Sequence, residues 1–219
     1  MYSPMAFKET DHAQLLQQIE ACGLALLVTQ GENGIQANHV PLLLTQHAGK
    51  ATLHGHLAKA NPQWRDLDTG TSVLVVFSGP EAYVSPGFYP SKVHNPAVVP
   101  TWNYVSVQAR GTPEVFSAPE RLYDLVAALT QRHEAGRALP WAIEEAPPTY
   151  IQKMLNAIIG FSIPIEQLQG KRKLSQNRSV TDQQGVASQL ANSPRASERT
   201  LATLMANGEG SLPINEQHP

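Results

Sequence analysis

The chain has 219 residues, of which 42% are hydrophobic and 16% charged, a composition typical of a globular protein with a sizeable core. The net charge of −2 gives no basic excess, so nucleic acid is not favoured as a partner, and the single cysteine, Cys22, excludes an intrachain disulfide. The sequence has no apolar run of membrane-span length and no signal peptide at its start. We therefore expect a cytoplasmic protein without membrane contact.

The first half of the chain predicts one helix followed by several short strands. Thr10 or Asp11 is a suitable N-cap for a helix over 11–22, which has an apolar stripe at helical spacing. Apolar segments then predict strands over 24–30, 35–45, 51–58 and 71–79, and "GENG" predicts a turn after the first of them. Residues 80–100 are rich in proline and also hold aromatic rings, which favours a long ordered loop.

The second half of the chain begins with "VPTWNYVSVQARG", residues 99–111. Its apolar and polar side chains alternate from Val105 onwards, which is the pattern of a half-buried strand. Helices are predicted over 120–134 and 148–158, and a strand over 158–170. The polar tail is expected to hold one helix over "ASERTLATLMA", capped by Ser193 or Ser197, and to be disordered over its last ten or so residues.

These elements predict a mainly β fold with peripheral helices. Short strands at close spacing, without a regular β-α alternation, favour an antiparallel barrel. We expect one domain over residues 1–190 and a partly disordered polar tail over 191–219.

The segment "LHGHLAKANPQWR", residues 53–65, brings imidazole, ammonium and amide groups close together in the sequence. His56, Lys59 and Asn61 are suited to a phosphate, because lysine supplies a mobile charge and the amide a hydrogen-bond donor. The alternative is an ordinary polar turn in which Asn61 caps a helix that starts at Pro62. No third ligand accompanies His54 and His56 at a suitable spacing, so no metal site is predicted.

Two further segments combine turns, rings and cations. "FSGPEAYVSPGFYPSK", residues 77–92, contains Ser85, Tyr89 and Lys92, and loops of this kind either wrap planar ligands or simply pack. "GKRKLSQNRS", residues 170–179, contains Lys173, Gln176 and Arg178, and is either a solvated basic turn or a site for a small anion. In "TWNY", two rings flank Asn103, an arrangement useful for a flat ligand with a polar edge.

Taken together, these blocks resemble the PaiB-like family of FMN-binding negative transcriptional regulators. The resemblance rests on "GHLAKANPQW", "VFSGPEAYVSPGFYPSK", "VPTWNYVSVQARG" and "GKRKLSQNR", supported by "NHVPLLL" and "LTQRHE" in the same order. It runs from the N-terminus to about residue 190. It implies an FMN-binding split β-barrel related to pyridoxamine-phosphate oxidase-like flavoproteins, working as a homodimer with the flavin at the subunit interface.

The resemblance also implies roles for individual residues. Lys59 and Asn61 hold the phosphate, with His56 nearby, and Trp102 and Tyr104 cover the isoalloxazine ring, with Asn103 on a polar edge. Ser85, Tyr89 and Lys92 line the ribityl and ring region, and Lys173, Gln176 and Arg178 close the site. The implied function is a flavin-dependent sensor or regulator. The alternatives are a flavin oxidoreductase and a haem-handling split barrel in which His54 or His56 is an axial ligand.

Overall fold

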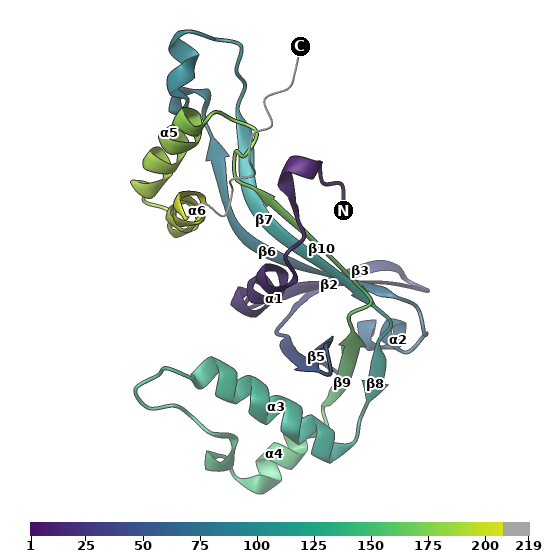
Figure 1. Cartoon of the computed structure of the whole chain (residues 1–219). Coiled ribbons are helices and arrows are strands. Elements are labelled where there is room, and N and C mark those ends of the chain that lie inside the picture. The colour runs from purple at the N-terminus through teal and green to yellow at the C-terminus, as the bar shows by residue number, and fades with distance from the viewer. Residues whose placement is uncertain (208–219) are drawn as a thin grey trace. The chain divides into compact units, whose positions relative to one another are not determined.

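The structure, a computed structural model, describes residues 1–207, and its fold is mainly β with helices set around the strands (Figure 1). The strands are β1 (Lys8–Glu9), β2 (Ala25–Gly31), β3 (Gly34–Val40), β4 (Leu43–His47), β5 (Lys50–Ala58), β6 (Val73–Val84), β7 (Thr101–Gly111), β8 (Glu114–Phe116), β9 (Ile158–Pro164) and β10 (Gln167–Lys173). The helices are α1 (His12–Ala21), α2 (Gln63–Leu67), α3 (Pro119–Glu134), α4 (Pro148–Leu155), α5 (Val180–Ala191) and α6 (Ala196–Ala206). Short 3₁₀ turns, η1 (Met5–Phe7), η2 (Pro86–Phe88), η3 (Pro90–Val93) and η4 (Ile143–Glu145), lie between them.

The strands form two sheets, with strand orders β1-β10-β7-β6-β2-β3 and β4-β5-β9-β8. The pairings of β2 with β3, β4 with β5 and β5 with β9 are antiparallel, as the strand spacing predicts. Gly31 pairs with Gly34, so the predicted "GENG" turn closes β2 onto β3, and Gly34 has the positive φ of +86° that favours glycine there.

Most elements lie where the sequence predicts them, and the differences have local causes. The expected strand over 35–45 is divided into β3 and β4 around Pro41, which has no N–H for a sheet hydrogen bond. The expected strand over 158–170 is divided into β9 and β10, and the strand expected to end at 79 continues to Val84. Helix α5 was not predicted, because its stripe is weak and it contains Gly185. The side chain of Ser179 caps it by accepting a hydrogen bond from the N–H of Asp182 at 3.2 Å.

The chain divides into two compact units. The first unit comprises Met1–Gln18, Ser78–Val107 and the chain from Gln169 onwards, and the second comprises Ile19–Phe77 and Gln108–Leu168. Helix α1 and strands β6, β7 and β10 contribute residues to both units.

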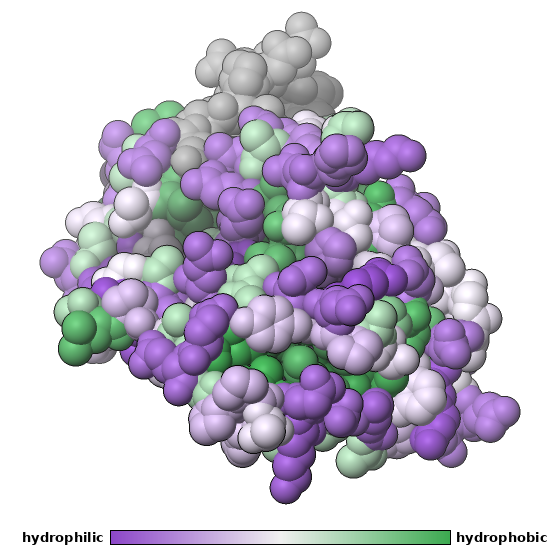
Figure 2. Space-filling view, turned by 90° about the horizontal axis from the view of Figure 1, so that it is seen from below, coloured by the Kyte–Doolittle hydropathy of each residue, from purple (hydrophilic) through white to green (hydrophobic). Residues whose placement is uncertain are grey.

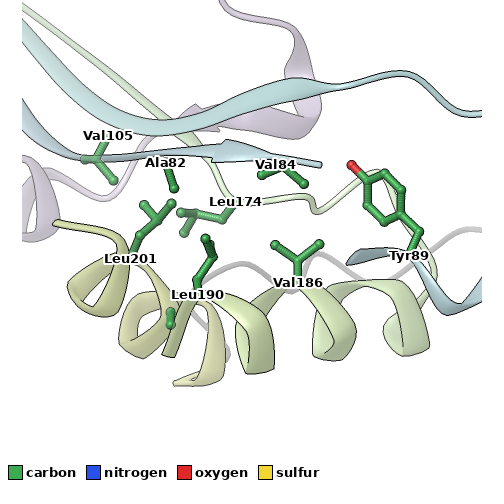
Figure 3. Close-up of a cluster of buried hydrophobic side chains, with 9 residues drawn as sticks. Ala82, Val84, Tyr89, Val105, Leu174, Val186, Leu190 and Leu201 are labelled. Atoms are coloured by element: carbon green, nitrogen blue, oxygen red, sulfur yellow. The ribbon is translucent and has the colours of Figure 1, made fainter. Parts of the chain in front are cut away.

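The core of the first unit lies between its strands and the helices α5 and α6. Figure 3 shows Val186 and Leu190 of α5 and Leu201 of α6 directed towards Ala82, Val84 and Leu174. The predicted helix over "ASERTLATLMA" is thus confirmed as α6, but its predicted caps are wrong. Arg195 precedes the helix without a side-chain cap, and the hydroxyl of Ser197 instead hydrogen-bonds to the backbone of Glu81.

The second unit packs helices against the sheet β4-β5-β9-β8. Leu122, Leu125 and Leu129 are the buried residues of α3, and Phe161 of β9 is fully buried. Figure 1 shows α3 beside β8 and β9, and α4 beside α3. In the range 1–207, no helix combines the length and the apolar character that crossing a membrane requires. The predicted disorder of the last ten or so residues concerns residues outside the described range, and the domain boundary at 190 stays a prediction.

We expect Leu201→Ala to lower the free energy of unfolding by about 2–5 kcal/mol, because it leaves a cavity in the core of the first unit. Thr203→Ala, an exposed change on the same helix, should alter it by less than about 0.5 kcal/mol. Urea denaturation measures both. Equal stability of the Leu201→Ala variant and the unchanged protein would show that α6 adds nothing to this core.

Candidate functional site

The entrance of β7 places an amide inside the first unit and two rings on the opposite face of the strand. Asn103 is 0% exposed and shares its face with Val105, whereas Trp102 is 49% exposed. The ring of Trp102 meets that of Tyr83 edge to face, with their centroids 5.9 Å apart. Trp102 is therefore a surface ring and Asn103 an interior polar group.

Asn103 is only partly satisfied by the protein. Its Nδ2 donates a hydrogen bond to Ser175 Oγ at 2.8 Å, across 72 positions of sequence. Its buried Oδ1 has no hydrogen-bond partner among residues 1–207. A buried acceptor without a donor costs about 1–3 kcal/mol, so this oxygen is a natural contact for a ligand N–H.

The turn after β10 holds Ser175 in an unusual conformation. Ser175 has a φ of +66°, which is uncommon for a residue other than glycine. Gln176 fixes this turn: its Oε1 accepts a hydrogen bond from the N–H of Leu174 at 2.7 Å, and its Nε2 donates to the carbonyl of Arg172 at 2.6 Å. The structure thus gives the predicted site residue Gln176 a positioning role towards Ser175.

Two lysines on β10 face aromatic rings of the first unit. Lys171 Nζ lies 5.1 Å from the ring centroid of Tyr104, and Lys173 donates a hydrogen bond to Thr101 Oγ1. Burial lowers the pKa of Lys173, and the neighbouring charges of Lys171 and Arg178 lower it further. Lys171 belongs to the basic segment 170–179 but was not among the predicted site residues, although its alternation with Lys173 on a strand indicates that both lie on one face.

The loop of residues 85–93 in the first unit contacts the start of α5. The guanidinium of Arg178 lies 4.8 Å from the ring centroid of Tyr89, and Ser91 donates through its N–H (3.0 Å) and its hydroxyl (2.7 Å) to the carboxylate of Asp182. The buried hydroxyl of Tyr89 has no hydrogen-bond partner in the described chain, and Figure 3 shows it pointing away from α5.

Two other predicted residues of this loop stay on or near its surface. Ser85 accepts a hydrogen bond from the N–H of Gly87 at 3.2 Å and so begins η2. Lys92 is exposed in η3.

His56, Lys59 and Asn61 belong to the second unit, at the end of β5. Lys59 is exposed, and its Nζ donates to the carbonyl of Asn156 at 2.7 Å. The side chain of Asn61 accepts a hydrogen bond from the N–H of Gln63 at 3.0 Å, the helix-start arrangement that the sequence left as an alternative. The amide keeps its Nδ2 group for other contacts.

A buried polar network, not anticipated from the sequence, anchors α2 directly after this turn. Gln63 Nε2 donates to the carbonyl of Leu27 at 3.1 Å, and its Oε1 accepts from Asn38 Nδ2 at 2.9 Å. The buried carboxylate of Asp66 accepts from Thr29 Oγ1 at 2.8 Å and from Gln36 Nε2 at 3.1 Å. These bonds fix α2 on β2 and β3 and so limit the positions open to the segment from Lys59 to Asn61.

The two histidines of β5 lie on one face of the strand. Burial lowers the pKa of both rings, and the charge of Arg121 also lowers that of His54. The buried Nδ1 of His56 has no hydrogen-bond partner in residues 1–207. No group of three or more His, Cys, Asp or Glu side chains in that range is arranged to hold a metal ion.

Each of the two groups, taken by itself, offers donors or rings that suit part of the chemistry of a flavin mononucleotide. The first unit offers an unpartnered amide oxygen, exposed rings and cations, which suit a planar ring with polar edges. The second unit offers an ammonium group and an imidazole, which suit a phosphate.

The comparisons with known proteins agree with this chemistry. Residues 1–167 match the family described as "Putative FMN-binding domain". The chain is 33% identical over 205 residues to "Protease synthase and sporulation protein PAI 2" of Bacillus subtilis, covering 94% of this chain and 96% of that protein.

Two solved structures share the fold at low identity. The flavocytochrome Anf3 from Azotobacter vinelandii superimposes with a TM-score of 0.58 at 16% identity, over 76% of this chain and 69% of the other. The FAD and heme binding protein from Mycobacterium smegmatis gives 0.55 at 20% identity, over 76% and 73%. The fold is that of the split-barrel flavoproteins.

This chain belongs to the FMN-binding domain family, and FMN is its cofactor. It is a homologue of the B. subtilis PAI 2 protein, as the resemblance in its sequence predicted.

The lowered pKa of His56 makes stability depend on pH. The unfolded chain takes up a proton at His56 near the ordinary value of 6.5, whereas the folded chain does so only at lower pH. The unfolded state therefore holds more protons than the folded state in this pH window, and stability falls as the pH drops below about 6.5.

We expect His56→Gln to reduce this loss of stability, measured by urea denaturation between about pH 7 and 5. His39→Gln, at an exposed histidine of β3, is the matched control. A wild-type slope in the His56→Gln variant would contradict the expectation.

Proposed function

We propose that this FMN-binding protein is a flavin-dependent regulator that works as a cytoplasmic homodimer. The observation that carries the flavin part is Asn103, a fully buried amide whose Oδ1 lacks a partner in residues 1–207. The regulatory part is supported by the near full-length similarity to a B. subtilis protein whose name refers to protease synthesis and sporulation.

In this proposal, residues of the first unit recognise the flavin ring. Asn103 Oδ1 accepts a hydrogen bond from an N–H on the polar edge of the ring, and Ser175 holds the amide so that this oxygen is presented. Trp102 and Tyr104 contact the ring faces, while Lys173 favours negative charge on the bound group. Ser85, Tyr89, Lys92 and Arg178 supply further contacts, and Gln176 positions the turn. When bound, FMN supplies a ring that accepts and returns electrons.

Residues of the second unit are proposed to contact the phosphate. Lys59 supplies the charge, because its ammonium group is exposed and, within residues 1–207, is held only by a backbone carbonyl. Asn61 donates through its Nδ2, and the neutral ring of His56 adds a hydrogen bond through Nδ1.

Exposed apolar side chains of the first unit support the homodimer. Tyr2, Met5 and Val99 are largely exposed, and Tyr83 and Trp102 are nearly half exposed. Several large apolar side chains on one compact unit are typical of a surface that is covered by a partner.

We expect Trp102→Ala to weaken FMN binding by about 0.5–1.5 kcal/mol, the range for an aromatic stacking contact. The stability of the flavin-free protein should fall by much less than the loss of about 3–5 kcal/mol expected for a fully buried tryptophan, because Trp102 is half exposed. Trp141→Ala, at a tryptophan of similar exposure outside the predicted flavin set, is the matched control. Flavin fluorescence titration and urea denaturation measure the two quantities. Normal FMN affinity together with a large loss of stability would show that "PTWNY" contributes to packing and not to flavin binding.

The regulatory proposal is tested by asking what the bound flavin controls. We expect the FMN-loaded chain to be a dimer by light scattering and to retain particular chromosomal DNA fragments of its source organism at about 150 mM salt. Lys59→Met should weaken FMN binding by about 1.5–3 kcal/mol and reduce this retention in parallel, whereas Lys153→Met, at an exposed lysine on α4, should leave both unchanged. Steady oxidation of NAD(P)H without DNA retention would identify an oxidoreductase instead, and a monomeric FMN-loaded chain would refute the dimer.

A further inference from the structure

The second unit contains a cavity of about 680 Å³ that none of the predicted flavin residues lines. It lies between α3 and the segment that leads from the end of α3 to η4. A volume of this size is in the range of small-molecule sites. The cavity therefore has room for a ligand of its own.

The floor of the cavity is apolar. Ala127 and Ala128 of α3 provide small side chains, Ile143 is buried, and Trp141 is 43% exposed at the cavity. The N–H of Trp141 donates to Glu134 Oε2 at 3.1 Å, which anchors this residue to α3. Figure 2 shows apolar surface at the bottom of hollows bordered by hydrophilic residues on the face seen from below.

All charged residues that line this cavity are acidic: Asp124, Glu134 and Glu144. Glu134 is paired with Arg137 at 3.2 Å, so much of its charge is compensated. Glu144 accepts a hydrogen bond from the neutral hydroxyl of Tyr123 at 2.8 Å, which leaves its charge in place. The side chain of Asp124 has no ion pair or hydrogen bond in the described part of the chain, and the nearby Arg121 of α3 pairs with Glu114 at 2.7 Å.

The pKa of Tyr123 supports the closeness of the two uncompensated carboxylates. The hydrogen bond to Glu144 raises this pKa most, and the charge of Asp124 raises it as well. The pKa of Glu144 is lowered by hydrogen bonds from its own backbone N–H and from Tyr123, so this carboxylate is ionised at neutral pH.

We propose that this cavity binds a small organic cation, with its ammonium group beside Asp124 and Glu144 and its apolar body against Ala127, Ala128 and Trp141. Charge complementarity selects the cation, because two negative charges lack a cationic partner in the described chain. The apolar floor selects a ligand with a hydrocarbon or aromatic part, and the indole ring of Trp141 adds a cation–π attraction. An anion such as FMN is repelled here, so the inference is independent of the flavin site.

The test is a calorimetric titration of the FMN-loaded full chain with phenethylammonium chloride. Its neutral counterpart 2-phenylethanol and its anionic counterpart 3-phenylpropionate have the same aromatic body. We expect saturable binding of the amine, about tenfold weaker binding of the alcohol and no binding of the carboxylate, since only the amine engages both charge and floor. Absence of saturable amine binding, or equal affinity for amine and alcohol, would overturn the proposal.

Two variants assign this binding to the cavity. Asp124→Asn should weaken amine binding by about three- to tenfold while leaving the binding of the alcohol unchanged. Glu120→Gln removes the same charge from α3 outside the cavity lining and should leave amine binding unchanged. Asp124 is exposed, so its exchange for asparagine should preserve the fold, which circular dichroism checks. Amine binding that is equally weakened in both variants, or unchanged in Asp124→Asn, would refute this location.

Discussion

A hydrogen bond between Asn103 and Ser175 fixes the centre of the first unit, and much of the candidate site depends on it. Burying an amide inside a strand is unfavourable unless its groups are paired. The bond to Ser175 satisfies one side of the amide, and Ser175 accepts it from a backbone conformation with positive φ. The side chain of Gln176 holds that conformation through two backbone hydrogen bonds. The unpaired oxygen of Asn103 is thereby held rigidly, which is what a ligand contact requires.

In the second unit, a larger network of hydrogen bonds pairs the buried polar side chains. Gln63 and Asp66 are buried on α2, and each is satisfied by amide, hydroxyl or carbonyl groups of β2 and β3. A short helix has few internal hydrogen bonds and relies on such tertiary contacts for its position. The network therefore limits the positions of Lys59 and Asn61, as the hydrogen bonds of Gln176 limit the position of Ser175.

Although the net charge of the chain is small, its positive and negative side chains form separate clusters. Lys171, Lys173 and Arg178 gather beside aromatic rings in the first unit, and the lining of the cavity in the second unit carries only carboxylates. Clusters of opposite charge favour ligands of opposite charge, which is why the flavin and an organic cation are assigned to different residues.

The sequence by itself determined the mainly β class, most strands, four of the helices and the flavin family. These features follow from local sequence patterns: the alternation along β7, the apolar stripe of α3, the turn at Gly34 and the signature blocks around "PTWNY" and "KLSQNR". It missed α5, whose formation depends on the packing of Val186 and Leu190 more than on a clear periodic pattern. Only the tertiary structure decided that Asn103 forms a hydrogen bond with Ser175 and that Lys171 faces Tyr104. It also decided that Gln176 forms hydrogen bonds with the backbone, and that acidic residues of α3 and η4 line one cavity. The physical reason is that local periodicity sets which face of an element is apolar, whereas contacts between distant residues follow from how those faces pack.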